Sequence, residues 1–340
     1  STMNNLINEF SIIESEYNKD DDFIDHILRP SGEKIEILDY VIMSSYTIPQ
    51  AVEEKILIKN SIPLFDTRFL NSSRGYTHYS EFYSGKTNTP LGINGEFTAS
   101  YLLEHNDDLI SGPDIRFNSP NYLLKLFEDQ DFQKKFETRD GSIKPKRKKY
   151  NSDSSVTLNQ TLIEHVNDWV SYIFDIDEKI SARETGFGNV TLYFGDDLIS
   201  NVGSGISQAL PVIINTIIAE DKFLFLEEVE QNLHASAQAK IADMIVMFSL
   251  FDRRFLVETH SEHLLNRLRL RHIQLSKGFD LTNNPIFNIY FIKHSVETDS
   301  IPQDMTINEK GQFSSEDIDK GFFDQSQLDT LSIIKELKEF

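Results

Sequence analysis

The amino-acid sequence predicts an α/β fold in which a mostly parallel sheet is flanked by helices, with a mainly helical lid or insertion. The prediction depends first on two nearly uninterrupted apolar runs, KFLFL at 222–226 and RRFLVE at 253–258. Each run is followed by a segment whose apolar residues have helical spacing. Strands of a parallel sheet are buried on both faces, so they show continuous apolar runs rather than alternation. Such strands in alternation with helices are typical of an α/β domain.

The composition is that of a folded, acidic protein. The chain has 340 residues, of which 39% are hydrophobic, enough for one large domain or two ordinary ones. It contains no cysteine, which excludes disulfides and zinc–thiolate sites. There is no apolar run of about 18 residues and no signal-peptide pattern at the N-terminus. We therefore expect a cytoplasmic protein that is not embedded in a membrane.

The chain as a whole is acidic, but it contains one short basic segment. The net charge of −21 disfavours non-specific binding of nucleic acid by the entire chain. The exception is KPKRKK, from Lys144 to Lys149, with five cations in six residues. A run of this kind is usually a solvated loop. The alternative is a contact to nucleic-acid phosphate or to an acidic partner.

The first 160 residues are mixed in character and rich in loops. FIDHIL and IPQAVEEKILI have helical spacing, so residues 1–60 are expected to contain helices. Gly92 and Gly95 precede a helix-like run, which predicts a loop that leads into a helix. Residues 105–160 are polar, and we expect a mobile insertion near 136–156.

From residue 157 onwards the pattern is regular. In chain order we expect a helix in TLIEHVNDWVSYIFDI, a hairpin in NVTLYFGDDLISNV, a helix in GISQALPVIINTIIA, the strand KFLFL, a helix in ASAQAKIADMIVMFSLF, the strand RRFLVE, a helix in HSEHLLNRLRLR, and strands in IFNIYFIKH and DMTINEKGQF. This order of elements is the basis for the predicted sheet.

Three polar clusters fall where open α/β sheets bind ligands, at the carboxyl ends of strands. The first holds the carboxylates Glu227, Glu228 and Glu230, directly after the first apolar run. The second is ETHSEH at 258–263, which follows the other run. The third is GSGIS at 203–207, which opens a predicted helix where backbone N–H groups can meet an anion.

Together these clusters predict a phosphate site with a divalent cation. Carboxylates beside an anion need a cation between them, and Mg²⁺ bound to a phosphate supplies it. His260, at the neighbouring strand end, can hydrogen-bond a terminal phosphate or an attacking water. Each cluster alone has a simpler explanation as a turn, a solvated helix start or an ordinary loop, and His260 and His263 lack the i, i+4 spacing of a zinc helix. The order and spacing of all three carry the inference.

At these residues the sequence resembles a known family. NVGSGISQALPVI, FLFLEEVEQNLHASAQAKIADM and FLVETHSEHLLNRLR are similar to the signature motif, Walker B strand and switch-histidine loop of ABC-type ATPases. The similarity is to their SMC-like and OLD-like bacterial branch, which is labelled AAA-family. KGFFDQS at 320–326 resembles a segment near the end of those proteins, and LGINGEFTASYLL resembles the segment that links their two lobes. The resemblance covers 62–104 and 160–326.

The resemblance implies a role for each matching residue. Glu227 would be the Walker B acid that holds Mg²⁺ through water, Glu228 the catalytic glutamate that polarises the attacking water, and His260 the switch histidine that senses the γ-phosphate. Glu230 matches a second acid of this branch, and His234 lies in a turn that faces the partner subunit. The signature residues, which bind the ATP held by the opposite subunit, are Gly203, Ser204, Gly205, Ser207 and Gln208.

The chain departs from the family pattern at three of its motif positions. Glu227 stands where Asp is usual, which keeps the charge on a longer arm. Val229 stands where Pro is usual. Gly203 occupies the place of the signature serine, so Ser204 would have to supply the phosphate contact.

A larger departure is that the chain contains no G-x-x-x-x-G-K-[ST] motif; Gly85-Lys86-Thr87 lacks the required glycine five residues ahead. We therefore expect the phosphate-binding loop upstream of this chain or in a partner. The resemblance then divides the chain into a helical lid, insertion or remnant of an upstream lobe at 1–60, a linking segment and insertion at 61–156, and the C-terminal lobe of an ABC-type ATPase at 157–340.

The function implied is an ATPase that binds ATP and Mg²⁺ between protomers of a homodimer or higher even oligomer, where hydrolysis gates a partner. Family members often act as the ATPase subunit of bacterial anti-phage defence systems beside a separate nuclease. One alternative is a non-hydrolysing scaffold built on a degenerate ATPase lobe. A third possibility is a metal-dependent phosphohydrolase that uses Glu227, Glu230, His234 and His260.

Overall fold

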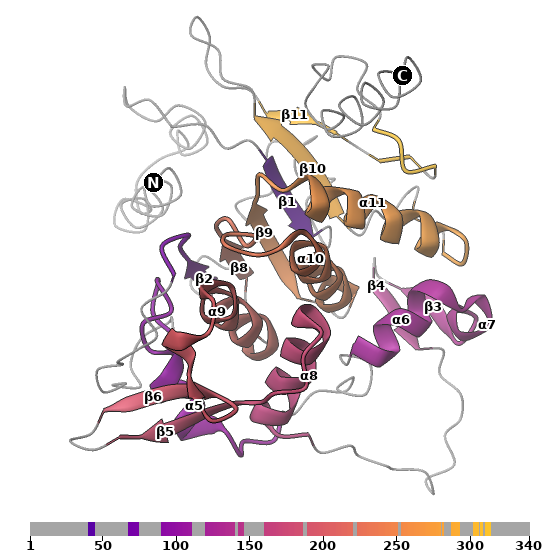
Figure 1. Cartoon of the computed structure of the whole chain (residues 1–340). Coiled ribbons are helices and arrows are strands. Elements are labelled where there is room, and N and C mark those ends of the chain that lie inside the picture. The colour runs from indigo at the N-terminus through magenta and orange to yellow at the C-terminus, as the bar shows by residue number, and fades with distance from the viewer. Residues whose placement is uncertain are drawn as a thin grey trace, which may run out of the picture.

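The structure is a computed structural model of the chain, shown in Figure 1. It describes residues 67–74, 90–110, 120–139, 142–145, 160–185, 189–219, 223–250, 253–279, 281, 287–292, 302–305, 307–308 and 310–313, together with the backbone of the strand at 40–44.

A six-stranded sheet in the order β11-β10-β1-β9-β8-β2 forms the centre of the fold. In that order its strands are Pro302–Asp304, Phe287–Ile292, Tyr40–Ser44, Arg254–Glu258, Phe223–Leu226 and Thr67–Leu70. β2, β8 and β9 are parallel neighbours, whereas β1 is antiparallel to both β9 and β10, and β11 is antiparallel to β10. The four strands β2, β8, β9 and β10 therefore share one direction, which confirms the predicted α/β fold with a mostly parallel sheet.

The helices that flank this sheet are those predicted from residue 157 onwards. They are α8 (Leu162–Phe174), α9 (Ser204–Ile218), α10 (Ala235–Leu250) and α11 (Glu262–Ser276) (Figure 1). α8 begins at a capping box in which the Thr161 and Glu164 side chains each accept a hydrogen bond from the other residue's backbone N–H. The Trp169 ring of α8 is fully buried and packs 5.8 Å from the Phe248 ring of α10, measured between centroids.

A smaller antiparallel sheet contains β5 (Ile180–Glu184), β6 (Val190–Phe194) and β7 (Asp197–Leu198), and the 3-10 turn η2 (Ile199–Asn201) follows. The hairpin β6–β7 confirms the predicted one. β5 was not predicted, because only the first residue of ISARE is buried and the strand carries little apolar signal. The predicted helix after Gly95 is α5 (Thr98–His105), which packs against β5 and β6.

The segment 105–160, expected to be polar and loop-rich with a mobile insertion near 136–156, contains regular helices and strands among its described residues. It forms α6 (Pro120–Glu128), α7 (Gln130–Gln133) and the hairpin β3–β4 (Phe136–Arg139 and Ser142–Pro145), and α6 and β4 pack against α10. Residues 136–139 and 142–145 of the expected insertion are therefore strands and not loops, whereas the mobility of the insertion stays a prediction. Phe127 and Phe136 are buried here, but these isolated apolar residues produce no periodic pattern. Lys144 and Pro145 belong to β4, and residues 146–149 of the basic run lie outside the described residues.

The N-terminal segment was predicted to be helical, but its described part is a strand. Residues 40–44 form β1, which lies between β9 and β10 in the large sheet. The helices predicted in FIDHIL and IPQAVEEKILI lie outside the described residues, as does the KGFFDQS segment at 320–326. None of the helices in the described residues is long and apolar enough to cross a membrane.

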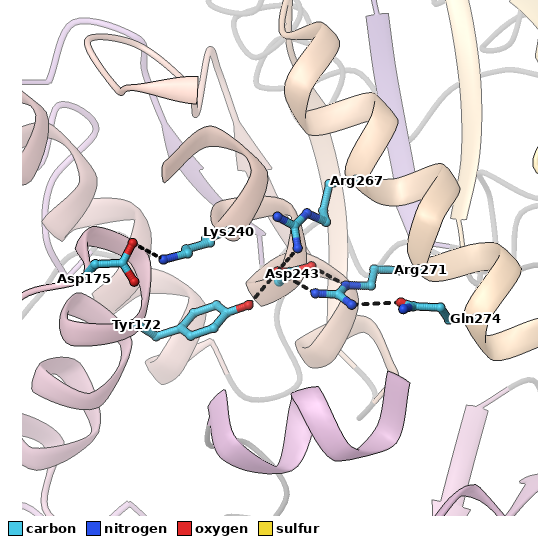
Figure 2. Close-up of polar contacts among 7 residues, drawn as sticks. All are labelled: Tyr172, Asp175, Lys240, Asp243, Arg267, Arg271 and Gln274. Atoms are coloured by element: carbon cyan, nitrogen blue, oxygen red, sulfur yellow. Dashed lines mark hydrogen bonds and ion pairs between the residues drawn. The ribbon is translucent and has the colours of Figure 1, made fainter. Parts of the chain in front are cut away.

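A buried carboxylate on α10 joins three helices, as Figure 2 shows. Asp243 is fully buried and accepts hydrogen bonds from Arg271 Nε at 2.6 Å, from Arg271 Nη2 at 3.1 Å and from the Tyr172 hydroxyl at 2.6 Å. Arg267 contributes a longer contact of 3.3 Å. Burial, and next the charge of Asp243, raise the pKa of Tyr172. The guanidinium of Arg271 also lies 4.2 Å from the ring of Phe127, which ties α6 to this helical layer.

Candidate functional site

Strand register brings two of the three predicted polar clusters, the acids after β8 and the residues after β9, to one edge of the large sheet. Leu226, the last residue of β8, is paired with Leu70 of β2 on one side and with Val257 of β9 on the other. The three parallel strands therefore end side by side, and the residues that follow them lie at the same edge of the sheet. Beyond β8 it stays bonded to both neighbours, because Glu227 N donates to Leu70 O and Glu228 N to Glu258 O, each at 3.0 Å.

We call residues 227–230 the acid turn. Glu227 is 2% exposed, and its Oε2 accepts a hydrogen bond from Ser72 N at 3.0 Å. Glu228 is partly exposed, and its Oε2 accepts one from Gln231 Nε2 at 3.3 Å. The φ of Glu228 is 43°, in the left-handed region that non-glycine residues seldom adopt. Such conformations persist where the surroundings hold them, and they cluster at functional sites.

Glu230 fixes the loop that carries His260. Its Oε2 accepts a hydrogen bond from the Thr259 hydroxyl at 2.7 Å, and its Oε1 accepts one from His260 N at 2.5 Å. The His260 side chain is exposed, whereas Thr259 is fully buried. Ser261 then caps α11 by accepting a hydrogen bond from Leu264 N at 3.0 Å. The carboxylate of Glu230 is therefore used to orient the histidine loop.

Glu258, the last residue of β9, is the most perturbed carboxyl group at this edge among the described residues. Its side chain is 8% exposed, and its pKa is raised to about 8. Burial is the largest cause, followed by the negative charge of Glu227; His260 acts in the opposite direction, and Glu228 and Glu230 raise the pKa further. A protonated carboxyl at neutral pH beside three other acids is therefore expected.

The predicted signature residues lie at the start of α9, against the turn that follows the acids. Gly203 and Ser204 are exposed, and no side chain caps the helix. The Ser207 hydroxyl is turned back onto its own helix, where it donates to Ser204 O at 2.9 Å. Gln208 Oε1 accepts from Asn232 Nδ2 at 2.8 Å, which joins α9 to the turn. His234, at the end of the same turn, is exposed.

Gly205 is the position where α9 approaches this turn most tightly. A Cβ atom there would lie 2.8 Å from Asn232 O and 3.3 Å from a methyl group of Leu233, whereas one on Gly203 would meet nothing within 4 Å. We expect Gly205→Ala to lower the free energy of unfolding by about 1–3 kcal/mol, because a backbone carbonyl cannot swing away as a side chain can. Urea denaturation checks this, with Gly203→Ala as the matched control, expected to stay within about 0.5 kcal/mol of wild type. Equal losses in both variants would contradict the close approach.

Sequence reasoning missed Arg74, which follows β2 and is 3% exposed. Its guanidinium donates to Glu227 O at 2.5 Å, Asn71 O at 2.8 Å, Glu228 O at 2.7 Å and Gln208 O at 3.2 Å. Burial lowers the pKa of Arg74 to about 10, against the opposing effect of the nearby glutamates, so it stays charged at neutral pH. The only signal in the sequence was an arginine shortly after TRFL, a run that was not predicted to be a strand.

The chemistry available at this edge is acid–base and electrostatic. Among the described residues no group of three or more His, Asp or Glu side chains is arranged to hold a metal ion. Mg²⁺ is usually held by one or two carboxylates together with substrate phosphates and water, so Glu227 would contribute to such a site beside a bound phosphate. What the edge offers is a partly exposed carboxylate at Glu228, an exposed imidazole at His260, and an uncapped helix N-terminus at Gly203.

An α/β fold with acidic residues at the carboxyl ends of its parallel strands agrees with the comparison with known families. Residues 114–265 match the family model described as AAA ATPase domain. The matched region contains the start of α9, the acid turn and His260, but not Arg74. No curated protein and no solved structure matches the chain. The family match supports an AAA-type ATPase and thus a general ATPase function, in domains that generally bind ATP with Mg²⁺.

Proposed function

We propose that this chain is part of an ABC/SMC-like ATPase in which ATP binding and hydrolysis at a dimer interface switch a partner. The observation that carries the proposal is the hydrogen bond between Gln208 and Asn232, which links the uncapped, exposed start of α9 to the residues directly after the acid turn. A free helix N-terminus attracts a phosphate, whereas acids attract its counterion. One face of the chain therefore presents both requirements of a nucleotide–Mg²⁺ complex.

The acid turn supports Glu228 as the residue that orients the attacking water. Its carboxylate is partly exposed, and its backbone is held by the Glu258 carbonyl and by Arg74. A group fixed in this way needs little rearrangement at the moment of reaction, and phosphoryl transfer depends mainly on positioning and electrostatics. His260, held by Glu230, would donate a hydrogen bond to the terminal phosphate. Glu227 would be the residue that helps to hold the Mg²⁺ bound to the nucleotide, as the resemblance implies.

The proposed dimer is supported by the resemblance and by the solvent exposure of residues around the start of α9. Gly203, Ser204 and His234 are exposed around the start of α9, so they are available to a second subunit. The phosphate-binding loop would come from residues upstream or from another chain. The resemblance further suggests a role in bacterial anti-phage defence with a separate nuclease, and the basic run from Lys144 is the candidate contact for nucleic acid.

The sharpest test compares two glutamates in the full-length protein with ATP and Mg²⁺. Glu228→Gln is expected to lower kcat about a hundredfold, the scale of a lost general base. Nucleotide binding should be kept, because the amide retains the shape of the side chain. Glu184→Gln, an exposed residue of β5, is the control and should leave kcat unchanged. Unchanged hydrolysis by Glu228→Gln would refute the assignment of Glu228.

Two further results of this experiment separate the alternatives. Sedimentation of Glu228→Gln with ATP should show an ATP-dependent dimer. A wild-type protein that dimerises but never hydrolyses ATP would favour the non-hydrolysing scaffold, an alternative supported by the missing G-x-x-x-x-G-K-[ST] motif. The metal-dependent phosphohydrolase has less support, because among the described residues no three His, Asp or Glu side chains are grouped to hold a metal ion.

A further inference from the structure

Arg74 connects three segments that are distant in the sequence. Its four hydrogen bonds go to backbone carbonyls: one in its own loop, two in the acid turn and one in α9. A guanidinium has five N–H groups in a rigid plane, so a single side chain can hold several carbonyls in fixed relative positions. A lysine has the same charge but lacks this fork.

These bonds fix the backbone of the acid turn without occupying the carboxylate proposed to act on water. Arg74 Nη2 binds the carbonyl of Glu228 at 2.7 Å, while the N–H of the same residue is held by Glu258 O. The peptide groups on both sides of this residue are thus bonded, which explains how its φ of 43° is maintained. Within the described part of the chain, the Glu228 carboxylate accepts a hydrogen bond only from Gln231.

The fourth bond attaches the same guanidinium to α9. Nε of Arg74 donates to the carbonyl of Gln208 at 3.2 Å. Pro211 lies inside this helix and has no N–H, so the Ser207 carbonyl lacks its intrahelical partner one residue before Gln208. The Gln208 side chain meanwhile binds Asn232 beyond the acid turn. Gln208 is therefore held on two sides, by Arg74 through its backbone and by Asn232 through its side chain.

We propose that Arg74 is a positioning residue that joins the N-terminal half of α9 to the acid turn, so that the two segments move as one unit. A ligand that shifts the start of α9 would then shift Glu228 with it. This inference rests on the proposed ATPase function for its consequence in catalysis, but not for the mechanical connection itself. The two can therefore be tested separately.

Hydrogen exchange without nucleotide tests the connection. In Arg74→Lys, amides at 204–210 and at 227–234 are expected to exchange about tenfold faster, as for the loss of a charge-assisted hydrogen bond. Amides of α8 and of the β5–β6 hairpin should be unchanged. The control is Arg183→Lys on β5, which contacts Gly195 O at 3.2 Å and should leave both segments unchanged. Faster exchange in only one segment, in neither, or equally throughout the protein would overturn the proposal.

A second variant tests the other link between the two segments and keeps the proposal testable if Arg74→Lys does not fold. Asn232 is exposed, with a φ of 58° that glycine also tolerates. Asn232→Gly removes the amide that binds Gln208. If Arg74 is the joining residue, exchange in both segments should rise only about two- to fivefold, the effect of one neutral hydrogen bond at an exposed position. A tenfold rise would assign the connection to Asn232 and overturn the role of Arg74.

ATP hydrolysis supplies the readout that a merely structural role would not give. Arg74→Lys should lower kcat about tenfold, with KM for ATP within about twofold and an unchanged stoichiometry of bound nucleotide. The stoichiometry shows that the folded fraction is intact. Full activity with lysine would show that charge alone suffices, and a raised KM with unchanged kcat would place the effect in binding; either result overturns the proposal. Should wild-type protein hydrolyse no ATP, the proposed function fails while hydrogen exchange still decides the role of Arg74.

Discussion

Asp243→Asn is expected to lower the free energy of unfolding by about 3–5 kcal/mol, the usual effect of removing one partner of a buried ion pair. Asparagine keeps the volume of the side chain but removes its charge. Arg271, which is 2% exposed, would then be a buried cation without its anion. The Tyr172 hydroxyl and both Arg271 donors would also lose an ionised acceptor, so the bonds to this side chain become weaker bonds to a neutral oxygen.

Urea denaturation followed by far-UV circular dichroism measures this loss, and the chain offers a matched control. Asp175 also pairs with a cation, Lys240, at 2.5 Å, but the Asp175 side chain is 73% exposed. Exposed pairs contribute little, so Asp175→Asn should change stability by less than about 1 kcal/mol. Its left-handed φ of 56° also suits asparagine. A loss below 1 kcal/mol in Asp243→Asn would mean that Asp243 does not hold the three helices together.

The elements that could be predicted from sequence are those with strong local signals. α8 combines helical spacing with a capping box at Thr161, and β8 and β9 are continuous apolar runs. β1 carries an apolar stretch too, but it lies far along the chain from β9 and β10, between which it pairs. Hairpin β3–β4 is too short and polar to give a pattern. These elements depend on tertiary contacts, which override local propensity.

The same division applies to the candidate site. Glu227, Glu228 and Glu230 were found because acids directly after a buried strand are unusual. Arg74 was not found, because it recognises carbonyl oxygens, and any sequence supplies those. It lies 153 residues from Glu227, whose carbonyl it binds, so no local spacing could indicate the contact. Glu258 was seen in ETHSEH, but its burial beside Glu227 follows from strand register and not from the motif.

Glu258→Gln is expected to be more stable than wild type at pH 8, by about 5 kcal/mol at most, with a difference that disappears towards pH 4. The folded-state pKa is about 8, against an ordinary value of 4.5. Between these values the folded state holds a proton that the unfolded state has released, so wild-type stability falls as pH rises. Below pH 4.5 both states are protonated and the carboxyl has no effect. The upper limit follows from about 1.4 kcal/mol for each pH unit in that interval.

Urea denaturation of both proteins from pH 4.5 to 8.5, in EDTA to remove divalent cations, measures the difference. Glu184→Gln, exposed on β5, is the control and should stay within about 0.5 kcal/mol of wild type throughout. A contrary result would be a difference in free energy of unfolding between Glu258→Gln and wild type that does not grow with pH, or a Glu258→Gln that is the less stable protein at pH 8. Either result would mean that the folded protein stabilises the ionised form of the Glu258 carboxyl. A buried acid that weakens the fold at neutral pH makes sense at a site whose ligand brings positive charge. Adding ATP with Mg²⁺ should therefore reduce the stability difference between Glu258→Gln and wild type, since a cation near Glu227 offsets the repulsion that keeps Glu258 protonated.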